Sequence, residues 1–374
     1  RGVEAWRRSL ANPSGSGIKE RARALDELLM SPLRKLLGET RRIFLSPDGA
    51  LNLIPFGALV DERGRYLVED YSITYLTSGR DLLRAQASAA SREGPLVIAN
   101  PSFGAGSPSA GGAPSSRLSQ LGGATFSPLP GTKGEASALG TILPGVRVLT
   151  GAQASEETLK RVSGPSILHV ATHGYFLPDL SPPVGADART AQARGLKLSR
   201  ERAERAPVEN PLLRSGLALA GANDGRGGAG EDGVLTAYEA ASLDLWGTRL
   251  VVLSACETGV GDVKTGEGVY GLRRSLVLAG SESQVMSLWQ VDDAATRDLM
   301  VEYYKRLQAG EGRTEALRAV QLEMLRQGGG QNEEGSERAL GAQQDAARRR
   351  PNRSHPFFWA SFIQSGDWRS MSGK

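Results

Sequence analysis

The chain has 374 residues, of which 40% are hydrophobic and 23% are charged, as is typical of globular proteins. Its 45 basic and 41 acidic residues leave a net charge of +4, too small to indicate a nucleic-acid-binding protein. No apolar run approaches the roughly 18 residues of a membrane span, and no signal peptide is recognisable. The single cysteine excludes an internal disulfide, so we expect a reducing, cytoplasmic location without a membrane partner.

Residues 1–38 are expected to form N-terminal helices. Apolar residues recur there at roughly helical spacing, with a break around the Asn-Pro-Ser-Gly sequence at 12–15. We predict a helical hairpin packed on the following domain. Since the chain begins at Arg1, we also expect it to be a fragment or a processed product.

Residues 39–94 are predicted to be rich in strands. Residues 42–46 and 71–76 have the apolar, β-branched composition of strands. Between apolar runs, the Pro-Asp-Gly sequence at 47–49 predicts a hairpin turn into a further strand at 51–54. This segment contains no candidate nucleophile or base.

Residues 95–374 alternate between predicted strands and helices, which is typical of a parallel sheet covered by helices. We expect strands at 95–101, 147–150, 167–173, 217–221, 250–256, 284–289 and 357–363, and helices at 133–143, 156–161, 232–241, 269–277, 294–308 and 314–326. The Gly-, Ser- and Pro-rich residues 104–125 are predicted to be a mobile loop. The polar insertions at 178–209 and 328–353 are expected to be surface loops or disordered.

Two of these strands carry the chemistry. One ends in Cys256 and the other in His173, which Gly174 follows. Parallel strands bring their last residues to the same edge of a sheet, so we expect the thiol and the imidazole to lie close together. A cysteine and a histidine are sufficient for nucleophilic acyl transfer. The alternatives are a buried structural cysteine and a hydrogen-bonded histidine at a strand end.

An ordered set of short sequences resembles the CHAT family of caspase-like cysteine peptidases, which is related to separase and the caspases. They are DGALNLIPF at 48–56, HVATHG at 169–174, LSACETG at 253–259, GEG at 266–268, SLWQVDD at 287–293 and HPFFWA at 355–360. The resemblance implies an α/β fold with a mainly parallel caspase-like sheet, helices on both faces and a strand-rich N-terminal extension. It divides the chain into a linker from upstream tetratricopeptide repeats at 1–38, the extension at 39–94 and a catalytic part at 95–374. No 34-residue repeat is recognisable within the chain itself.

The resemblance also implies a mechanism. Cys256 would be the nucleophile, His173 the base and acid, and the backbone N–H groups of Gly174 and Cys256 the oxyanion hole. It requires no third catalytic residue, metal or organic cofactor. The implied setting is bacterial, cytoplasmic and regulatory, with a protein substrate and a sensor or activator as partners.

Other residues have both a structural and a functional interpretation. Asp292 and Asp293 either cap the following helix or, with Trp289, line the substrate pocket; a similar stretch in separase lies near an arginine-binding pocket. We expect Asp293 to be the better pocket residue. Glu267 either orients the loop after Cys256 or begins a helix. His169 is expected to be a packed histidine or to support His173, because histidines alone make a poor metal site.

The sequence therefore predicts a cysteine endopeptidase in regulated signalling, defence or cell death. If Asp293 selects arginine or lysine, the arginine-rich insertion would be a site of self-cleavage between about Arg189 and Arg205. The main alternative is a catalytically inactive scaffold that binds partner proteins. An acyltransferase or transpeptidase would share the nucleophile, and a redox sensor is disfavoured because the chain has no second cysteine.

Overall fold

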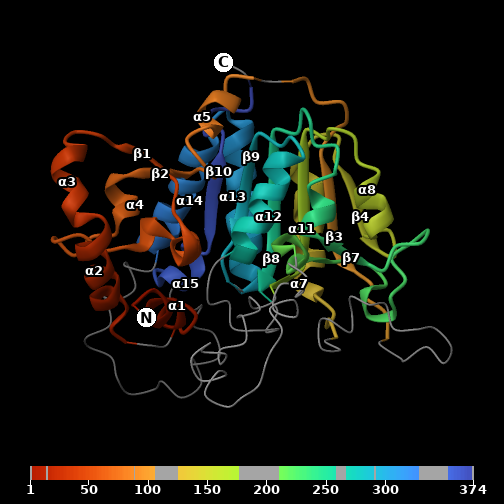
Figure 1. Ribbon diagram of the computed structural model, residues 1–374, viewed down its shortest axis with the longest axis horizontal. Helices are drawn as coiled ribbons and strands as arrows, with labels where there is room; N and C mark the ends of the chain where they lie inside the picture. The colour runs from red at the N-terminus through yellow and green to blue at the C-terminus, as the bar shows by residue number, and fades with distance from the viewer. Residues whose placement is uncertain are drawn as a thin grey trace, which may run out of the picture.

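The computed structural model describes residues 2–13, 16–87, 89–105, 125–176, 210–257, 267–289, 292–327 and 353–372 (Figure 1). Within these ranges, no helix has both the length and the apolar character needed to cross a membrane. The predicted loop at 104–125 and the insertions at 178–209 and 328–353 lie almost wholly outside the described residues.

One sheet runs through the described part of the chain, and its ten strands are mainly parallel. The main path has the order β1-β2-β10-β9-β8-β5-β3-β4, in which only β9 and β10 are antiparallel neighbours. Two further strands, β6 and β7, extend antiparallel from the end of β5. The strands are β1 (Arg42–Leu45), β2 (Ser72–Tyr75), β3 (Leu96–Pro101), β4 (Arg147–Gly151), β5 (Ile167–Phe176), β6 (Ser215–Ala218), β7 (Val234–Thr236), β8 (Leu250–Glu257), β9 (Ser283–Ser287) and β10 (Phe362–Gly366).

Helices cover both faces of this sheet (Figure 1). Helices α7, α13 and α14 pack in a row on one face, and α11 and α12 lie on the other. The α/β fold with a mainly parallel sheet is therefore confirmed. The α-helices are α1 (Gly2–Leu10), α2 (Ile18–Leu29), α3 (Ser31–Leu37), α4 (Leu67–Asp70), α5 (Asp81–Arg84), α7 (Pro130–Ile142), α8 (Glu156–Lys160), α11 (Ala237–Ala240), α12 (Glu267–Leu278), α13 (Asp293–Gln308), α14 (Arg313–Gln327) and α15 (Pro356–Trp359).

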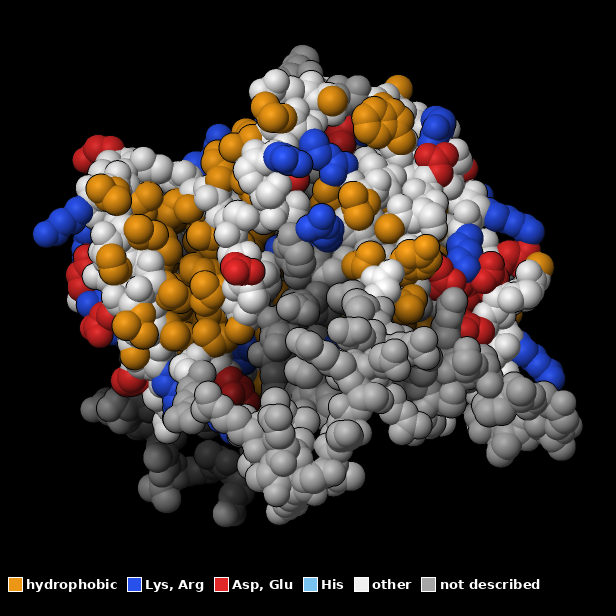
Figure 2. Space-filling view, viewed as in Figure 1, with side chains coloured by type: hydrophobic (Ala, Val, Ile, Leu, Met, Phe, Trp, Pro, Cys, Tyr) orange, Lys and Arg blue, Asp and Glu red, His pale blue; other side chains and the backbone are white. Residues whose placement is uncertain are grey.

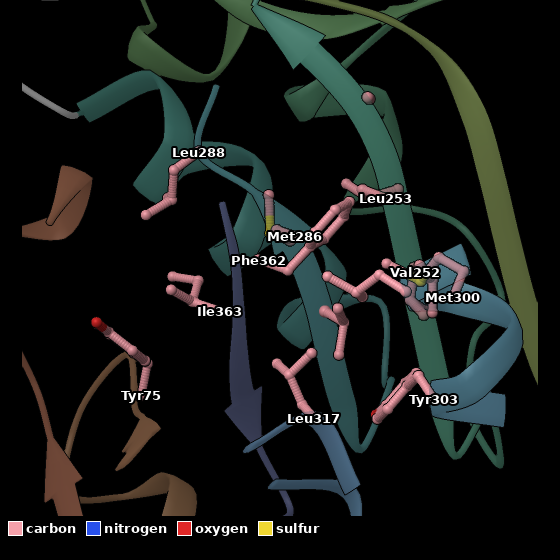
Figure 3. Packing of buried hydrophobic residues seen from close by; sticks show 14 of the residues in the cluster. Tyr75, Val252, Leu253, Met286, Leu288, Met300, Tyr303, Leu317, Phe362 and Ile363 are labelled. Atoms are coloured by element: carbon pink, nitrogen blue, oxygen red, sulfur yellow. The ribbon is translucent and has the colours of Figure 1, made fainter. Parts of the chain in front are cut away.

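The core lies along the central strands. Strand β8 begins with four apolar residues, Leu250 to Leu253, that are each at most 2% exposed. Because helices cover both faces of the strand, consecutive positions are apolar rather than alternating with polar ones. Figure 3 shows part of this core, with Met300 and Tyr303 of α13 and Leu317 of α14 packed towards the strands.

The N-terminal helices form as predicted, but the predicted hairpin at 47–54 is wrong. Strand β1 pairs in parallel with β2, and residues Gly49–Leu53 form the 3-10 helix η1 instead of a strand. Asp48 begins this helix by accepting a hydrogen bond from the Gly49 N–H. Asn52 then accepts one from Arg273 of α12. The residues expected to form a hairpin turn therefore begin a 3-10 helix, which is anchored by an arginine distant in sequence. A local sequence pattern cannot reveal such a contact.

Three further predictions are wrong in part. The helix expected at 232–241 divides into β7 and the short helix α11. The divide lies at Thr236, which ends β7 and caps α11 by accepting a hydrogen bond from the Glu239 N–H. The strand expected at 357–363 begins as helix α15 and becomes β10 only at Phe362. The strand expected at 217–221 is β6, which begins and ends earlier.

Apolar side chains are exposed on the N-terminal part of the molecule. Figure 2 shows them gathered on the left, over the region of α2, α3 and β1. These elements carry four exposed large apolar residues, Leu28, Leu33, Leu36 and Phe44, of which Leu36 is 83% exposed. Apolar surface of this kind is typical of a protein-contact face.

Candidate active site

Strands β5 and β8 lie side by side and pair in parallel from Ile167 and Leu250 to Gly174 and Glu257. The register matches His173 with Cys256, and Gly174 with Glu257. Paired Cα atoms on neighbouring strands are about 4.8 Å apart, so the two predicted catalytic positions adjoin at one edge of the sheet. The structure describes Cys256 through its backbone, and its side chain lies outside the described part.

His173 is held tightly in place. Its imidazole is 8% exposed and lies close to the rings of Phe103 and Phe126, at centroid distances of 5.2 and 5.8 Å. Its Nε2 lies 2.7 Å from the backbone oxygen of Ser127. A carbonyl oxygen can only accept a hydrogen bond, so Nε2 carries the proton and Nδ1 is the basic nitrogen of the neutral ring.

The surroundings of His173 favour its neutral form. Burial lowers the pKa of His173 below its ordinary value, and the hydrogen bond to Ser127 offsets part of that effect. A neutral imidazole near neutral pH can accept a proton from a thiol or from water. The site thus supplies a base at the position that pairs with Cys256.

An acidic cavity lies beside His173. Its lining includes Glu135 of α7, Ser254 of β8 and Asp293 of α13. Glu135 is 3% exposed and accepts a hydrogen bond from the Ser254 hydroxyl at 3.2 Å. Two carboxylates that converge on one small cavity make it suited to a cationic side chain.

His169 belongs to a buried polar network behind the cavity. The residue is fully buried, its Nδ1 lies 3.0 Å from the Tyr304 hydroxyl, and its Nε2 lies 3.2 Å from a Glu135 carboxylate oxygen. Burial above all raises the pKa of Tyr304, so the phenol is protonated and donates to Nδ1. Nε2 then carries the proton and lies near Glu135 without a well-aligned hydrogen bond, which places His169 beside the cavity wall and not in contact with His173.

Asp292 and Asp293 have different environments. The Asp292 side chain caps α13 by accepting a hydrogen bond from the Ala295 N–H at 2.9 Å. Asp293 begins the helix and lines the cavity. Partial burial raises the pKa of Asp293, although the residue as a whole is exposed, and the neighbouring Asp292 and Glu135 raise it further. Gly131 lets the Asp293 carboxylate lie against the start of α7, because a Cβ there would lie 1.9 Å from that carboxylate and would displace it.

The remaining predicted site residues lie as follows. The Trp289 side chain is buried, and its indole Nε1 donates to the Phe357 backbone oxygen at 3.1 Å, which anchors it to α15. Glu267 is the first residue of α12, as expected for an acidic residue at a helix start. Gly174 pairs with β8 on one side and with Leu217 of β6 on the other. The roles of these residues stay predictions.

Three carboxylates elsewhere are close enough together to suggest a metal site. They belong to Glu156, Glu231 and Glu239, but the Lys160 ammonium lies 2.7, 2.6 and 3.2 Å from them. Burial alone lowers the pKa of Lys160, yet its hydrogen bonds to Glu156 and Glu231 raise it above its ordinary value. The lysine charge therefore occupies the position that a cation would take, and the cluster joins α8 to α11.

Sequence reasoning missed several residues of this site. Phe103, Phe126 and Ser127 flank a loop with no strand or helix pattern, and Ser127 contributes only its backbone oxygen. Glu135 offered a signal, because it precedes the buried Leu139 by one helical turn and therefore lies on the buried face of α7. An acidic residue on that face indicates a polar partner in the interior.

Comparisons with known proteins agree with this architecture. A sequence model of the CHAT domain family matches residues 19–367. Tetratricopeptide repeat protein 28 of Homo sapiens is 27% identical over 332 residues, covering 84% of this chain and 13% of that protein. Its Mus musculus counterpart is 26% identical over 348 residues, with the same coverage. Both relatives are mammalian and give no support to the bacterial setting.

One solved structure that the comparison matched to this chain is the Saccharomyces cerevisiae separase–securin complex. Its TM-score is 0.40 at 13% sequence identity, and the match covers 86% of this chain and 15% of that chain. The chain thus spans a small part of the length of each of these similar proteins.

Proposed function

Because this chain belongs to the CHAT domain family, we propose that it is a caspase-like cysteine endopeptidase in which Cys256 and His173 form the catalytic dyad. The observation that carries the proposal is the pairing of these two residues across β5 and β8. The bond from Ser127 supports it, because that bond leaves Nδ1 of a buried, neutral His173 as the basic nitrogen.

The reaction takes place in two stages. The Cys256 thiol gives its proton to His173, and the thiolate attacks the scissile carbonyl carbon to form a C–S bond. The backbone N–H groups of Gly174 and Cys256 stabilise the oxyanion. The C–N bond breaks as His173 protonates the leaving amine. Water, deprotonated by His173, then attacks the thioester, and the C–S bond breaks to release the carboxylic acid product and the thiol.

The acidic cavity supports a preference for substrates with a basic residue before the scissile bond. Glu135 and Asp293 line it next to His173, so a substrate side chain entering beside the dyad would meet two carboxylates. Arginine or lysine before the scissile bond forms charge-assisted hydrogen bonds with them. An apolar residue at that position would meet two carboxylates and offer neither a hydrogen bond nor a positive charge, which disfavours it.

The setting is part of the same proposal. A free thiol stays reduced most readily in a reducing compartment, which favours a cytoplasmic location. Protein partners are in keeping with the exposed apolar residues of α2, α3 and β1, which offer a contact face for a sensor or activator.

The proposal is tested by covalent labelling. An acyloxymethyl ketone probe carrying arginine should modify the wild-type protein at one site, identified by peptide mass analysis as Cys256. Cys256→Ala should not react, and neither should wild-type protein pretreated with iodoacetamide. Peptide cleavage should follow the same pattern. The wild-type protein is assayed both alone and with cell extract added as a source of activator. If it is neither labelled by the probe nor able to cleave the peptide under either condition, it would instead be a scaffold that binds partner proteins.

A further inference from the structure

Asn223 joins the two chain segments that enclose His173. It lies in the 3-10 helix η4 (Ala222–Asp224), remote from His173 in the sequence. Its side-chain oxygen accepts from the Phe126 N–H at 2.8 Å, and its amide nitrogen donates to the Phe126 backbone oxygen at 2.9 Å. The amide also donates to the Gly104 oxygen at 3.1 Å, and the Asn223 backbone N–H donates to Phe103 at 2.8 Å.

These four hydrogen bonds act on the groups that fix the imidazole. Phe103 and Phe126 are the two rings beside His173, and Ser127, which follows Phe126, provides the oxygen that Nε2 contacts. Asn223 itself does not contact His173 in any described interaction. Its effect on the histidine therefore passes through the backbone of residues 103–104 and 126–127.

The two segments are also held by packing, since Phe103 and Phe126 lie in a buried apolar cluster with Tyr175 and Val234, but apolar packing alone does not direct the Ser127 carbonyl. Residues 125–129, which carry the Ser127 oxygen, form neither strand nor helix. Gly104 has a φ of +94°, and a Cβ there would lie 1.9 Å from the Asp224 carboxylate. The chain at 104 is thus shaped to lie against η4, which brings its carbonyl within reach of the Asn223 amide.

We propose that Asn223 is the positioning residue that holds the Ser127 carbonyl on Nε2 of His173 and so fixes the tautomer with Nδ1 as the base. An asparagine suits this task because one planar amide both donates and accepts, as a neighbouring strand would. The expected effect on cleavage rests on the proposed peptidase function. The effect on the histidine tautomer does not.

Two substitutions separate hydrogen bonding from packing. Asn223→Ala removes all three side-chain bonds. Asn223→Asp has nearly the same shape and keeps an acceptor for the Phe126 N–H, but it loses both donated bonds. Asn210→Ala is the matched control, because among the described residues the Asn210 side chain accepts a hydrogen bond from the Leu212 N–H in its own turn and from no other group.

The first readout is the tautomer. The chain has three histidines, so ¹⁵N-histidine labelling gives a simple spectrum in which His173→Gln identifies the His173 signals. Wild type and Asn210→Ala should show His173 protonated at Nε2. Asn223→Ala and Asn223→Asp should show a mixture of tautomers, with unchanged signals from His169 and His355. Thermal melting checks that each variant is folded.

The second readout is the rate of peptide cleavage. Both Asn223 variants should lose about 10- to 100-fold in kcat with little change in KM, because a small displacement of a catalytic group is costly whereas substrate binding is not altered. A single Nε2–H tautomer in both folded variants would overturn the positioning role, and so would unchanged kcat. If wild type shows the Nε2–H tautomer and the variants a mixture, but no protein cleaves peptides, the peptidase proposal fails and the positioning role stands.

Discussion

The backbone oxygen of Ser127 lies 2.7 Å from Nε2 of His173, although 46 residues separate them in sequence. In a neutral histidine one ring nitrogen donates and the other accepts, so the carbonyl decides which nitrogen is basic. The Ser127 carbonyl is an uncharged hydrogen-bond acceptor beside a buried imidazole. It therefore orients the imidazole without adding a charge to the site. The dyad therefore has a backbone group where other hydrolases use a carboxylate.

The first prediction concerns the dyad. Cys256→Ala and His173→Ala should each reduce kcat/KM to less than about one hundredth of wild type, because each removes a group that makes or breaks bonds. Initial rates on an arginine-containing peptide provide the measurement. Residual activity above that level in either variant would remove the residue from the chemical step.

The two variants should differ in stability. His173 is almost fully buried beside two aromatic rings, and His173→Ala would leave the Ser127 oxygen without its partner. We expect a loss of about 1–3 kcal/mol in the free energy of unfolding, from denaturant titration. His173→Gln keeps a hydrogen-bond donor for the Ser127 oxygen and should therefore lose less stability than His173→Ala. It controls for a loss of activity that is caused by misfolding.

The second prediction concerns pH. Burial lowers the pKa of His173, partly offset by Ser127, so the neutral base persists to lower pH than in a free histidine. Activity should therefore rise from acid pH with a midpoint below about 6.5, and hold through neutral pH. A profile of kcat/KM between pH 4 and 8 tests this, in buffers of constant ionic strength. A maximum below about pH 5 would point to a pair of carboxylates instead.

Much of the site's framework could be predicted from the sequence. The apolar runs before His173 and Cys256 indicate buried parallel strands, and such strands bring their last residues to one edge. The Ser127 contact could not be predicted, because a backbone carbonyl has no residue-specific pattern. The misassigned strand at 51–54 has a similar cause, since Arg273 of α12 anchors η1 through a contact that is distant in sequence.

The third prediction tests the acidic cavity. Asp293→Asn should lower kcat/KM for peptides with arginine or lysine before the scissile bond by about 10-fold, the lower end of what a charged hydrogen bond contributes, because Asp293 is exposed. Asp292→Asn is the matched control, because asparagine caps a helix as well as aspartate does. A peptide library gives the preference. Preference for small or apolar residues that does not change in Asp293→Asn would contradict the proposal.

The fourth prediction concerns a buried ion pair. Arg313 at the start of α14 is 1% exposed and contacts Glu282 at 2.7 Å and Asp367 at 3.4 Å. Arg313→Ala would leave Glu282 without its counter-charge and Asp367 with only Arg369 as its partner, and should lower the free energy of unfolding by about 3–5 kcal/mol.

The comparison for that ion pair is Arg42→Ala. Arg42 pairs with Glu315 at 3.5 Å, with side chains 48% and 40% exposed. Solvent screens such a pair, so the loss should be below about 1 kcal/mol. Unfolding of wild type, Arg313→Ala and Arg42→Ala in guanidinium chloride gives the loss of stability for each variant. Equal losses would show that burial does not determine the contribution of Arg313.

The last prediction joins the cavity to the arginine-rich insertion at 178–209, which lies outside the described residues. Strand β5 ends at Phe176, three residues after His173, and the described chain resumes at Asn210 beside β6. The insertion is thus tethered at the edge where the dyad lies, and tethering raises its local concentration to roughly the millimolar range. If the cavity selects arginine, wild type should be nicked between about Arg189 and Arg205.

Intact-mass analysis should find no nick in Cys256→Ala and slower nicking in Asp293→Asn. Incubating Cys256→Ala with catalytic amounts of wild type separates cleavage within one molecule from cleavage between molecules, since only the second would nick the inactive protein. Intact wild-type protein that cleaves arginine peptides in solution would show that the insertion does not enter the site.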